Sequence, residues 1–129
     1  MDICLSVGSN RSYEDVEKAL VWLQSKIFNF KTSRLYKTPS IHHNESSYVN
    51  AVVKGSIDTS LEDFNNLLKE YELKSGRDDT ARKSGLVPID IDIVIGNGKI
   101  LRVRDYKQEF FKIGFLELTG SEIEDKSDK

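Results

Sequence analysis

The sequence has a single cysteine, Cys4, and no feature of a membrane or nucleic-acid protein. One cysteine cannot form a disulfide within the chain, so we expect a core residue and a reducing, cytoplasmic location. No apolar run approaches the roughly 18 residues of a membrane span, and the N-terminus lacks a signal-peptide pattern. The formal net charge is −2, with 19 basic and 21 acidic residues, so no strongly basic surface for nucleic acid is expected.

The chain of 129 residues is long enough for one domain with a substantial core, and it contains neither an internal repeat nor a linker-like segment. Residues 117–129 hold five acidic residues against two basic ones, and Ile123 is the one apolar residue from Thr119 onward. We therefore expect a single domain over residues 1–118, followed by a disordered acidic tail over residues 119–129.

Residues 88–95 carry the most informative pattern, an alternation of isoleucine with aspartate and valine. The period of two predicts a strand with Asp90, Asp92 and Val94 on one face. The opposite face would carry Ile89, Ile91, Ile93 and Ile95. Aspartate is depleted in strands, and like charges on one face repel. Two such carboxylates stand about 6.6–7 Å apart at their α-carbons and can converge on Mg²⁺, whereas the alternative is a solvated polar face.

The rest of the chain supplies two amphipathic helices, each with a serine N-cap, Ser12 and Ser60. The expected elements are strands over 2–7, 30–37, 48–57 and 88–95, a short return strand over 99–103, and helices over 12–27, 60–76 and 105–118. The order βαββαβ predicts an α+β, ferredoxin-like sandwich, in which an antiparallel four-stranded sheet has two helices on one face, plus a C-terminal helix. The aspartate face would then be bare, and two polar loops, 38–47 and 77–87, could cover a ligand there. His42 and His43 are interpreted as loop residues, because adjacent side chains point in different directions.

Five short motifs occur in one order along residues 1–118, on this topology. They are Gly8-Ser9-Asn10, Tyr36-Lys37-Thr38-Pro39, Tyr48-Val49-Asn50-Ala51, Glu72-Leu73 with Gly76-Arg77, and Asp90-Ile91-Asp92. With these motifs the chain resembles the 6-hydroxymethyl-7,8-dihydropterin pyrophosphokinase family of folate biosynthesis. The resemblance implies transfer of pyrophosphate from ATP to the hydroxymethyl group of the pterin, with release of AMP. In such a reaction the protein mainly positions the substrates and neutralises the charge of the phosphates.

The resemblance also implies a role for each matching residue. Asp90 and Asp92 would bind two Mg²⁺ ions and act in catalysis, together with the loop cations Arg82 and Lys83. The pterin would contact Thr38, Pro39, Tyr48, Asn50 and Phe115, with Tyr48 and Phe115 on either side of its ring. The nucleotide would contact Glu72, Arg77 and Ile93. The partners implied are ATP and the pterin, with neither nucleic acid nor membrane, and the protein would be a monomer or weak dimer.

Three departures from the family pattern fall on the nucleotide side. Val87 stands where an arginine is usual, Ser84-Gly85-Leu86 replaces Trp-Gly-Pro, and no Pro-His-Tyr element lies between Leu101 and Phe111. The first hypothesis is an active pyrophosphokinase with substitute cations, for which the candidates are Lys83, Arg102, Arg104 and Lys112. The alternatives are a pterin- or nucleotide-binding protein that has lost transfer activity and a ferredoxin-like regulatory domain without catalysis.

Overall fold

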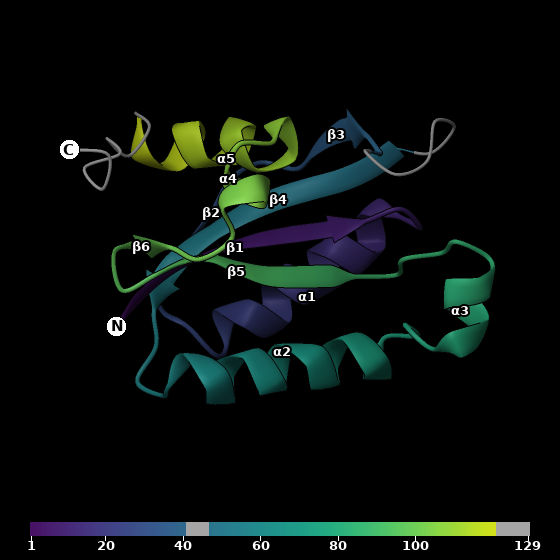
Figure 1. The fold of residues 1–129 in the computed structure, drawn as a ribbon, viewed down its shortest axis with the longest axis horizontal. Helices are drawn as coiled ribbons and strands as arrows, with labels where there is room; N and C mark the ends of the chain where they lie inside the picture. Colours follow the sequence, from purple (N-terminus) through teal and green to yellow (C-terminus); the bar gives the residue numbers. More distant parts are fainter. Residues whose placement is uncertain (41–46, 121–129) are drawn as a thin grey trace.

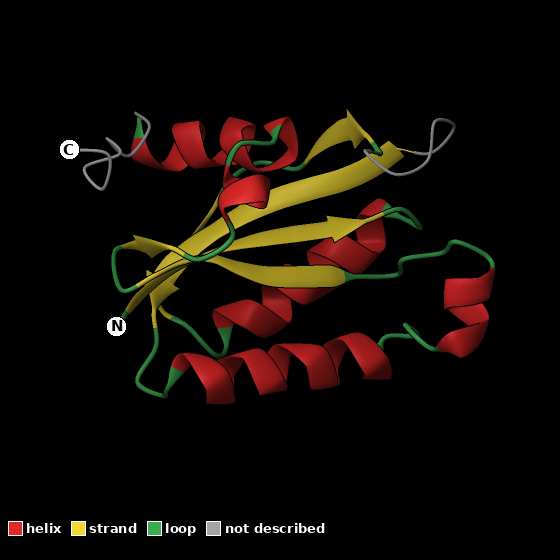
Figure 2. Ribbon diagram, viewed as in Figure 1, coloured by secondary structure: helices red, strands yellow, loops and turns green. Residues whose placement is uncertain are grey.

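The computed structural model describes residues 1–40 and 47–120, and within them it contains six strands and five helices (Figures 1 and 2). The strands are β1 (Asp2–Ser9), β2 (Phe28–Thr32), β3 (Tyr36–Pro39), β4 (Ser47–Ser56), β5 (Asp90–Gly96) and β6 (Lys99–Ile100). The helices are α1 (Tyr13–Gln24), α2 (Leu61–Lys74), α3 (Asp79–Lys83), α4 (Val103–Tyr106) and α5 (Glu109–Thr119). His42 and His43 and residues 121–129 of the predicted tail lie outside the described residues.

All strands belong to one antiparallel sheet in the order β2-β4-β1-β5-β6, and β3 also pairs with β4. The prediction of an α+β chain with an antiparallel sheet is confirmed, but the sheet has six strands in the described residues instead of four. The predicted strand over 30–37 is divided because Ser33 takes over the pairing with Val52. The Ser33 amide donates to the Val52 carbonyl (2.9 Å), and its hydroxyl accepts from the Val52 amide (2.9 Å). The predicted return strand is shortened to β6.

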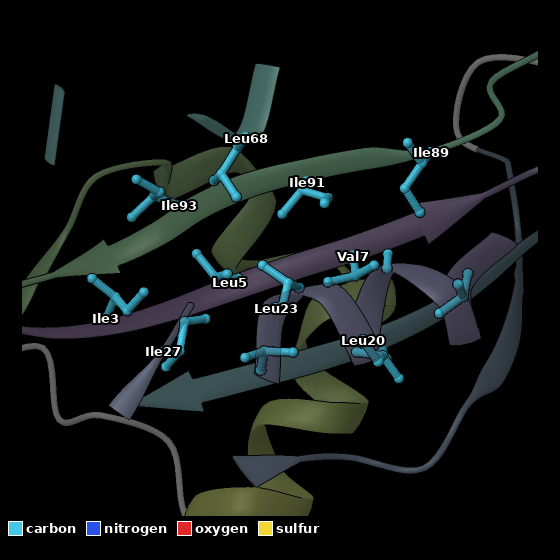
Figure 3. Close-up of a cluster of buried hydrophobic side chains, with 14 of the residues drawn as sticks. Ile3, Leu5, Val7, Leu20, Leu23, Ile27, Leu68, Ile89, Ile91 and Ile93 are labelled. Carbon is cyan, nitrogen blue, oxygen red and sulfur yellow. The ribbon is translucent and has the colours of Figure 1, made fainter. Parts of the chain in front are cut away.

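Helices α1 and α2 cover one face of the sheet and bury a wholly apolar cluster against it (Figure 3). Both predicted N-caps are confirmed: the Ser12 hydroxyl accepts from the Asp15 amide at 3.2 Å, and the Ser60 hydroxyl from the Asp63 amide at 3.0 Å. The cluster includes Ile3, Leu5, Val7, Val16, Leu20, Leu23, Val49, Ala51, Val53, Phe64, Leu68, Ile89, Ile91 and Ile93. This face is therefore closed to solvent.

The sequence predicted that the opposite face is bare, and this prediction is wrong. Helices α4 and α5 lie over part of that face (Figure 1). A second apolar cluster joins these helices to the sheet and consists of Cys4, Val52, Val94, Ile95, Tyr106, Phe111 and Phe115. Cys4 is thus a core residue as predicted, and burial raises the pKa of its thiol to about 12. The predicted helix over 105–118 is two helices, α4 and α5.

The prediction for the isoleucine face is correct for Ile89, Ile91 and Ile93, which pack under the helices, and wrong for Ile95. Leu5 pairs with Ile93 but Cys4 pairs with Ile95, so β5 has one extra residue at this point. Such a β-bulge inverts the alternation of side chains beyond it. It turns Ile95 to the second cluster, beside Val94.

The segment over 77–87, predicted as a loop, contains α3, a short helix that begins after the N-cap Asp78. In Figure 1 it lies beyond the first residue of β5, at the end of the sheet. Among the described residues, none of the helices is sufficiently long and apolar to cross a membrane.

Candidate active site

A pocket of about 640 Å³, including its open mouth, lies on the sheet face that carries α4 and α5. Its described lining comes from four strands, two helices and their connections: Ser6, Gly8, Thr38, Pro39, Ser40, Tyr48, Asn50, Asp90, Asp92, Arg102, Asp105 and Phe110. Six of the residues predicted to form the site are therefore brought together: Thr38, Pro39, Tyr48, Asn50, Asp90 and Asp92.

The two aspartates reach the pocket from the same face of β5 and converge. The Asp90 carboxyl is 37% exposed and that of Asp92 only 16%. Both side chains line the same pocket. Burial, and then the nearby charge of Asp90, raises the pKa of Asp92 to about 6, although Lys69 and Arg102 act in the opposite direction. The pair therefore concentrates negative charge that a cation can relieve.

Side chains from α2 and the segment after it contact these carboxylates. Arg77 Nη1 donates to Asp90 Oδ1 at 2.8 Å, and Lys69 Nζ donates to Asp92 Oδ1 at 3.3 Å. Burial would lower the pKa of Lys69, but Asp92 and Glu72 outweigh it and the pKa is raised. Both cations therefore stay charged at neutral pH.

Asn50 forms the part of the pocket nearest β3. Its residue is only 2% exposed, and its amide nitrogen donates to Thr38 Oγ1 at 2.8 Å and to the Tyr48 carbonyl at 3.1 Å. These bonds fix the side-chain amide so that its oxygen lies toward Gly8, where an added Cβ would stand 3.4 Å from it. Glycine at this position therefore leaves the amide oxygen room to meet a ligand.

Arg102 enters the pocket from the start of α4 and is its one cation among the described lining residues. Its Nε donates to Asp105 Oδ2, and its Nη1 stands 3.9 Å from Asp92 Oδ1. Of the four substitute cations suggested by the sequence, Arg102 is the one that lines the described pocket. Asp105 was missed by the sequence analysis, and its only signal is its helical spacing, i+3, from Arg102.

Other predicted site residues lie elsewhere. Phe115 is 3% exposed in the second cluster, and Phe110 lines the pocket instead. Arg82 is exposed on α3 beside Asp79, and Lys83 is exposed on the same helix. The two phenylalanines have the same residue type and helix, so nothing in the sequence distinguished them.

The remaining two residues predicted to contact the nucleotide have buried side chains. Ile93 packs in the cluster under α1 and α2, and Glu72 is only 4% exposed behind β5. Neither belongs to the described lining of the pocket. Glu72 instead contacts Arg77 and Lys69, the cations that reach the two aspartates.

Among the described residues, no group of three or more His, Cys, Asp or Glu side chains could enclose a metal ion. Mg²⁺ is usually bound by one or two protein carboxylates, and substrate phosphates and water complete its coordination sphere. Asp90 and Asp92 are therefore sufficient as protein ligands. No curated protein matches this sequence significantly. The model of one family, 7,8-dihydro-6-hydroxymethylpterin-pyrophosphokinase, matches residues 4–120, and the chain therefore belongs to that family.

Proposed function

We propose that this protein transfers the pyrophosphoryl group of ATP to the hydroxymethyl oxygen of 6-hydroxymethyl-7,8-dihydropterin and releases AMP. Family membership supports the reaction class. The observation that carries the proposal for this chain is the convergence of Asp90 and Asp92 in one pocket with Asn50 and Tyr48. A pair of hard oxygen donors beside a binding surface for a flat polar ring is what this reaction requires.

Asp90 and Asp92 fit a site for Mg²⁺, and we place two ions there. Their oxygens are hard ligands, both side chains line the same pocket, and burial together with the charge of Asp90 raises the pKa of Asp92. Bound Mg²⁺ would offset the charge that develops on the phosphate oxygens. The role of the two side chains is to hold the triphosphate beside the attacking hydroxyl in an in-line orientation.

The pterin would lie on the part of the pocket formed by β3, β4 and α5. The fixed amide of Asn50 offers its oxygen to an N–H group of the ring. Tyr48 and Phe110 line the pocket from different elements and would stack on the two faces of the ring, so Phe110 takes the place first given to Phe115. Thr38 and Pro39 would contact its rim.

Arg102 is the cation best placed to bind the triphosphate. Since Asp105 occupies its Nε, the two terminal nitrogens can turn to phosphate oxygens. Arg77 lies outside the described pocket lining, where it binds Asp90 and Glu72. Arg82 and Lys83 on α3 would have to move toward the pocket to contact a bound triphosphate.

A second candidate function is pterin binding without transfer. The observation in its favour is that Arg102 is the one cation among the described residues lining the pocket, whereas a triphosphate with Mg²⁺ normally meets several. The two candidates make the same prediction for pterin binding and opposite predictions for AMP formation.

The test is to measure AMP formation from ATP, Mg²⁺ and hydroxymethyldihydropterin, together with pterin binding by quenching of intrinsic fluorescence. Active enzyme should form AMP, and Arg102→Ala should lower kcat/KM for ATP by roughly tenfold or more, as expected for loss of a charge-assisted hydrogen bond. Arg104→Ala removes the same charge two residues away, outside the described pocket lining, and should change kcat/KM little. Pterin binding without AMP formation would favour the second candidate.

A further inference from the structure

The outer edge of β5 is closed by side chains of α2 instead of another strand. Strand β6 pairs only with Ile95 and Gly96, at the far end of β5. Beside the aspartates, the Ile91 amide donates to Glu72 Oε2 at 2.8 Å, and the Ile91 carbonyl accepts from Lys69 Nζ at 3.1 Å. Two charged side chains thus replace a strand where the aspartates are held.

Glu72 is the centre of this arrangement. Its side chain is 5% exposed, and it accepts hydrogen bonds from Arg77 Nη1 at 2.8 Å and from Lys69 Nζ at 2.9 Å, in addition to the Ile91 amide. A buried carboxylate is costly unless its oxygens are paired in this way. The Glu72 carboxylate therefore holds both cations tightly.

The same two cations contact the aspartates of the pocket. Arg77 Nη1 lies 2.8 Å from both Glu72 Oε1 and Asp90 Oδ1. Lys69 Nζ lies 2.9 Å from Glu72 Oε2 and 3.3 Å from Asp92 Oδ1. Each cation is thus shared between Glu72, behind the strand, and one aspartate in the pocket.

The sharing has a consequence for the charge of the pocket. Without Glu72, Lys69 and Arg77 would neutralise Asp90 and Asp92 completely. With Glu72 the three carboxylates outnumber the two cations, and a negative charge remains on the pocket side. Arg102 also stands 3.9 Å from Asp92 Oδ1, but it pairs with Asp105, and the two together add no net charge.

We propose that Glu72 is a positioning residue that draws Lys69 and Arg77 partly away from Asp90 and Asp92, so that the aspartates keep the negative charge needed to bind a divalent cation. This inference rests on the proposed metal-dependent function. It assigns to Glu72 an action through two cations, in place of contact with the nucleotide.

The experiment measures Mn²⁺ binding to the full chain by electron paramagnetic resonance, without ATP or pterin. Glu72→Gln keeps the size of the side chain and removes its charge, and it should raise the Kd for Mn²⁺ about tenfold, or roughly 1.4 kcal/mol. Glu70→Gln is the matched control, because Glu70 lies on the same helix and pairs with exposed Lys74. It should leave the Kd unchanged within twofold.

Lys69→Gln distinguishes charge sharing from a simple structural brace. Removing this cation leaves more negative charge at Asp92, so Mn²⁺ should bind more tightly, and the double variant Glu72→Gln/Lys69→Gln should bind better than Glu72→Gln alone. A structural brace predicts weaker binding in both comparisons. The Lys69→Gln result stands even if Glu72→Gln does not fold.

Three results would overturn the inference: wild-type protein that does not bind Mn²⁺, a folded Glu72→Gln variant with the wild-type Kd, or weaker binding by Lys69→Gln. Failure of the proposed reaction has a different signature. In that case wild-type protein and the variants would bind Mn²⁺ in the expected order, while no AMP would be formed.

Discussion

The two faces of residues 89–93, at the start of β5, have opposite chemistry although they belong to one short stretch of the chain. Toward α1 and α2, Ile91 is fully buried and Ile89 and Ile93 are nearly so, in a cluster made only of apolar side chains. Toward the pocket, Asp90 and Asp92 lie beside three cations, Lys69, Arg77 and Arg102. One face stabilises the fold by burial, and the other accumulates charge that burial opposes.

The difference shows where a strand can carry carboxylates. Asp90 and Asp92 are tolerated because their face opens to a pocket and because Lys69 and Arg77 reach them at the edge of β5 that α2 covers. On the helix side, the cluster of described residues is wholly apolar, so a carboxylate within it would remain unpaired. The chemistry of each face follows from what covers it.

The largest effect is expected from placing a charge on the closed face. In Ile91→Asp the new carboxylate would replace a side chain with 0% exposure in the apolar cluster, and the loss of apolar burial adds to the cost. We expect destabilisation above about 4 kcal/mol, so that the chain does not fold. Circular dichroism during thermal unfolding measures the effect.

The paired variant on the open face is Asp92→Ala. It should abolish AMP formation and yet give a cooperative unfolding transition, because its side chain faces the pocket. If Ile91→Asp and Asp92→Ala had similar melting temperatures, the two faces would not differ as described.

The repeat of isoleucine with aspartate and valine was sufficient to predict these faces from Ile89 to Val94, because a regular strand has a period of two. The period failed at Ile95, where a bulge opposite Cys4 and Leu5 inserts a residue. A bulge depends on the pairing of two strands that are distant in the sequence, so the local pattern of β5 does not predict it.

The carboxylate pair could be predicted for the same reason, but its surroundings could not. The contacts of Lys69 and Arg77 with the aspartates depend on how α2 packs beside β5. Helix α5 begins at Glu109 and packs against β4. Its rotation about its own axis turns Phe110 to the pocket and Phe115 to the second cluster. These features arise from packing between elements, which sequence periodicity does not describe.

An intermediate effect is expected at the second cluster, which closes the other part of the pocket face. Gly114 lets α5 approach the sheet: a Cβ there would stand 2.6 Å from Val52 Cγ2 and 2.9 Å from Ser33 Oγ. The Gly114 amide also donates to the Tyr36 hydroxyl at 3.0 Å. Gly114→Ala should destabilise the protein by about 1–3 kcal/mol through overpacking, measured by urea unfolding.

The control for this prediction is a glycine substitution without crowding. Gly98 has no atom within 4 Å of an added Cβ, but its φ of +79° favours glycine, so Gly98→Asn keeps a residue that tolerates this conformation. It should cost less than Gly114→Ala. An equal or greater loss would show that α5 is not held at this close contact.

The smallest effect on stability is expected at the charged face and has the opposite sign. Because burial and Asp90 raise the pKa of Asp92 to about 6, the folded protein holds a proton that the unfolded chain, with an ordinary pKa of about 3.9, releases earlier. The contribution of Asp92 to stability should therefore fall as the pH rises from about 4 to 6, and the loss persists at higher pH.

Asp92→Asn removes this titration and keeps the shape of the side chain. It should stabilise the protein by about 1–2 kcal/mol at pH 7.5, less than the shift alone would give because contacts with Lys69 and Arg102 are lost, and by little at pH 4. Urea unfolding of both proteins at the two pH values measures the difference. If the difference in free energy of unfolding between the variant and the wild type were the same at pH 4 and pH 7.5, the raised pKa would not belong to Asp92. A gain at pH 7.5 combined with loss of AMP formation would show that this face of β5 trades stability for a metal site.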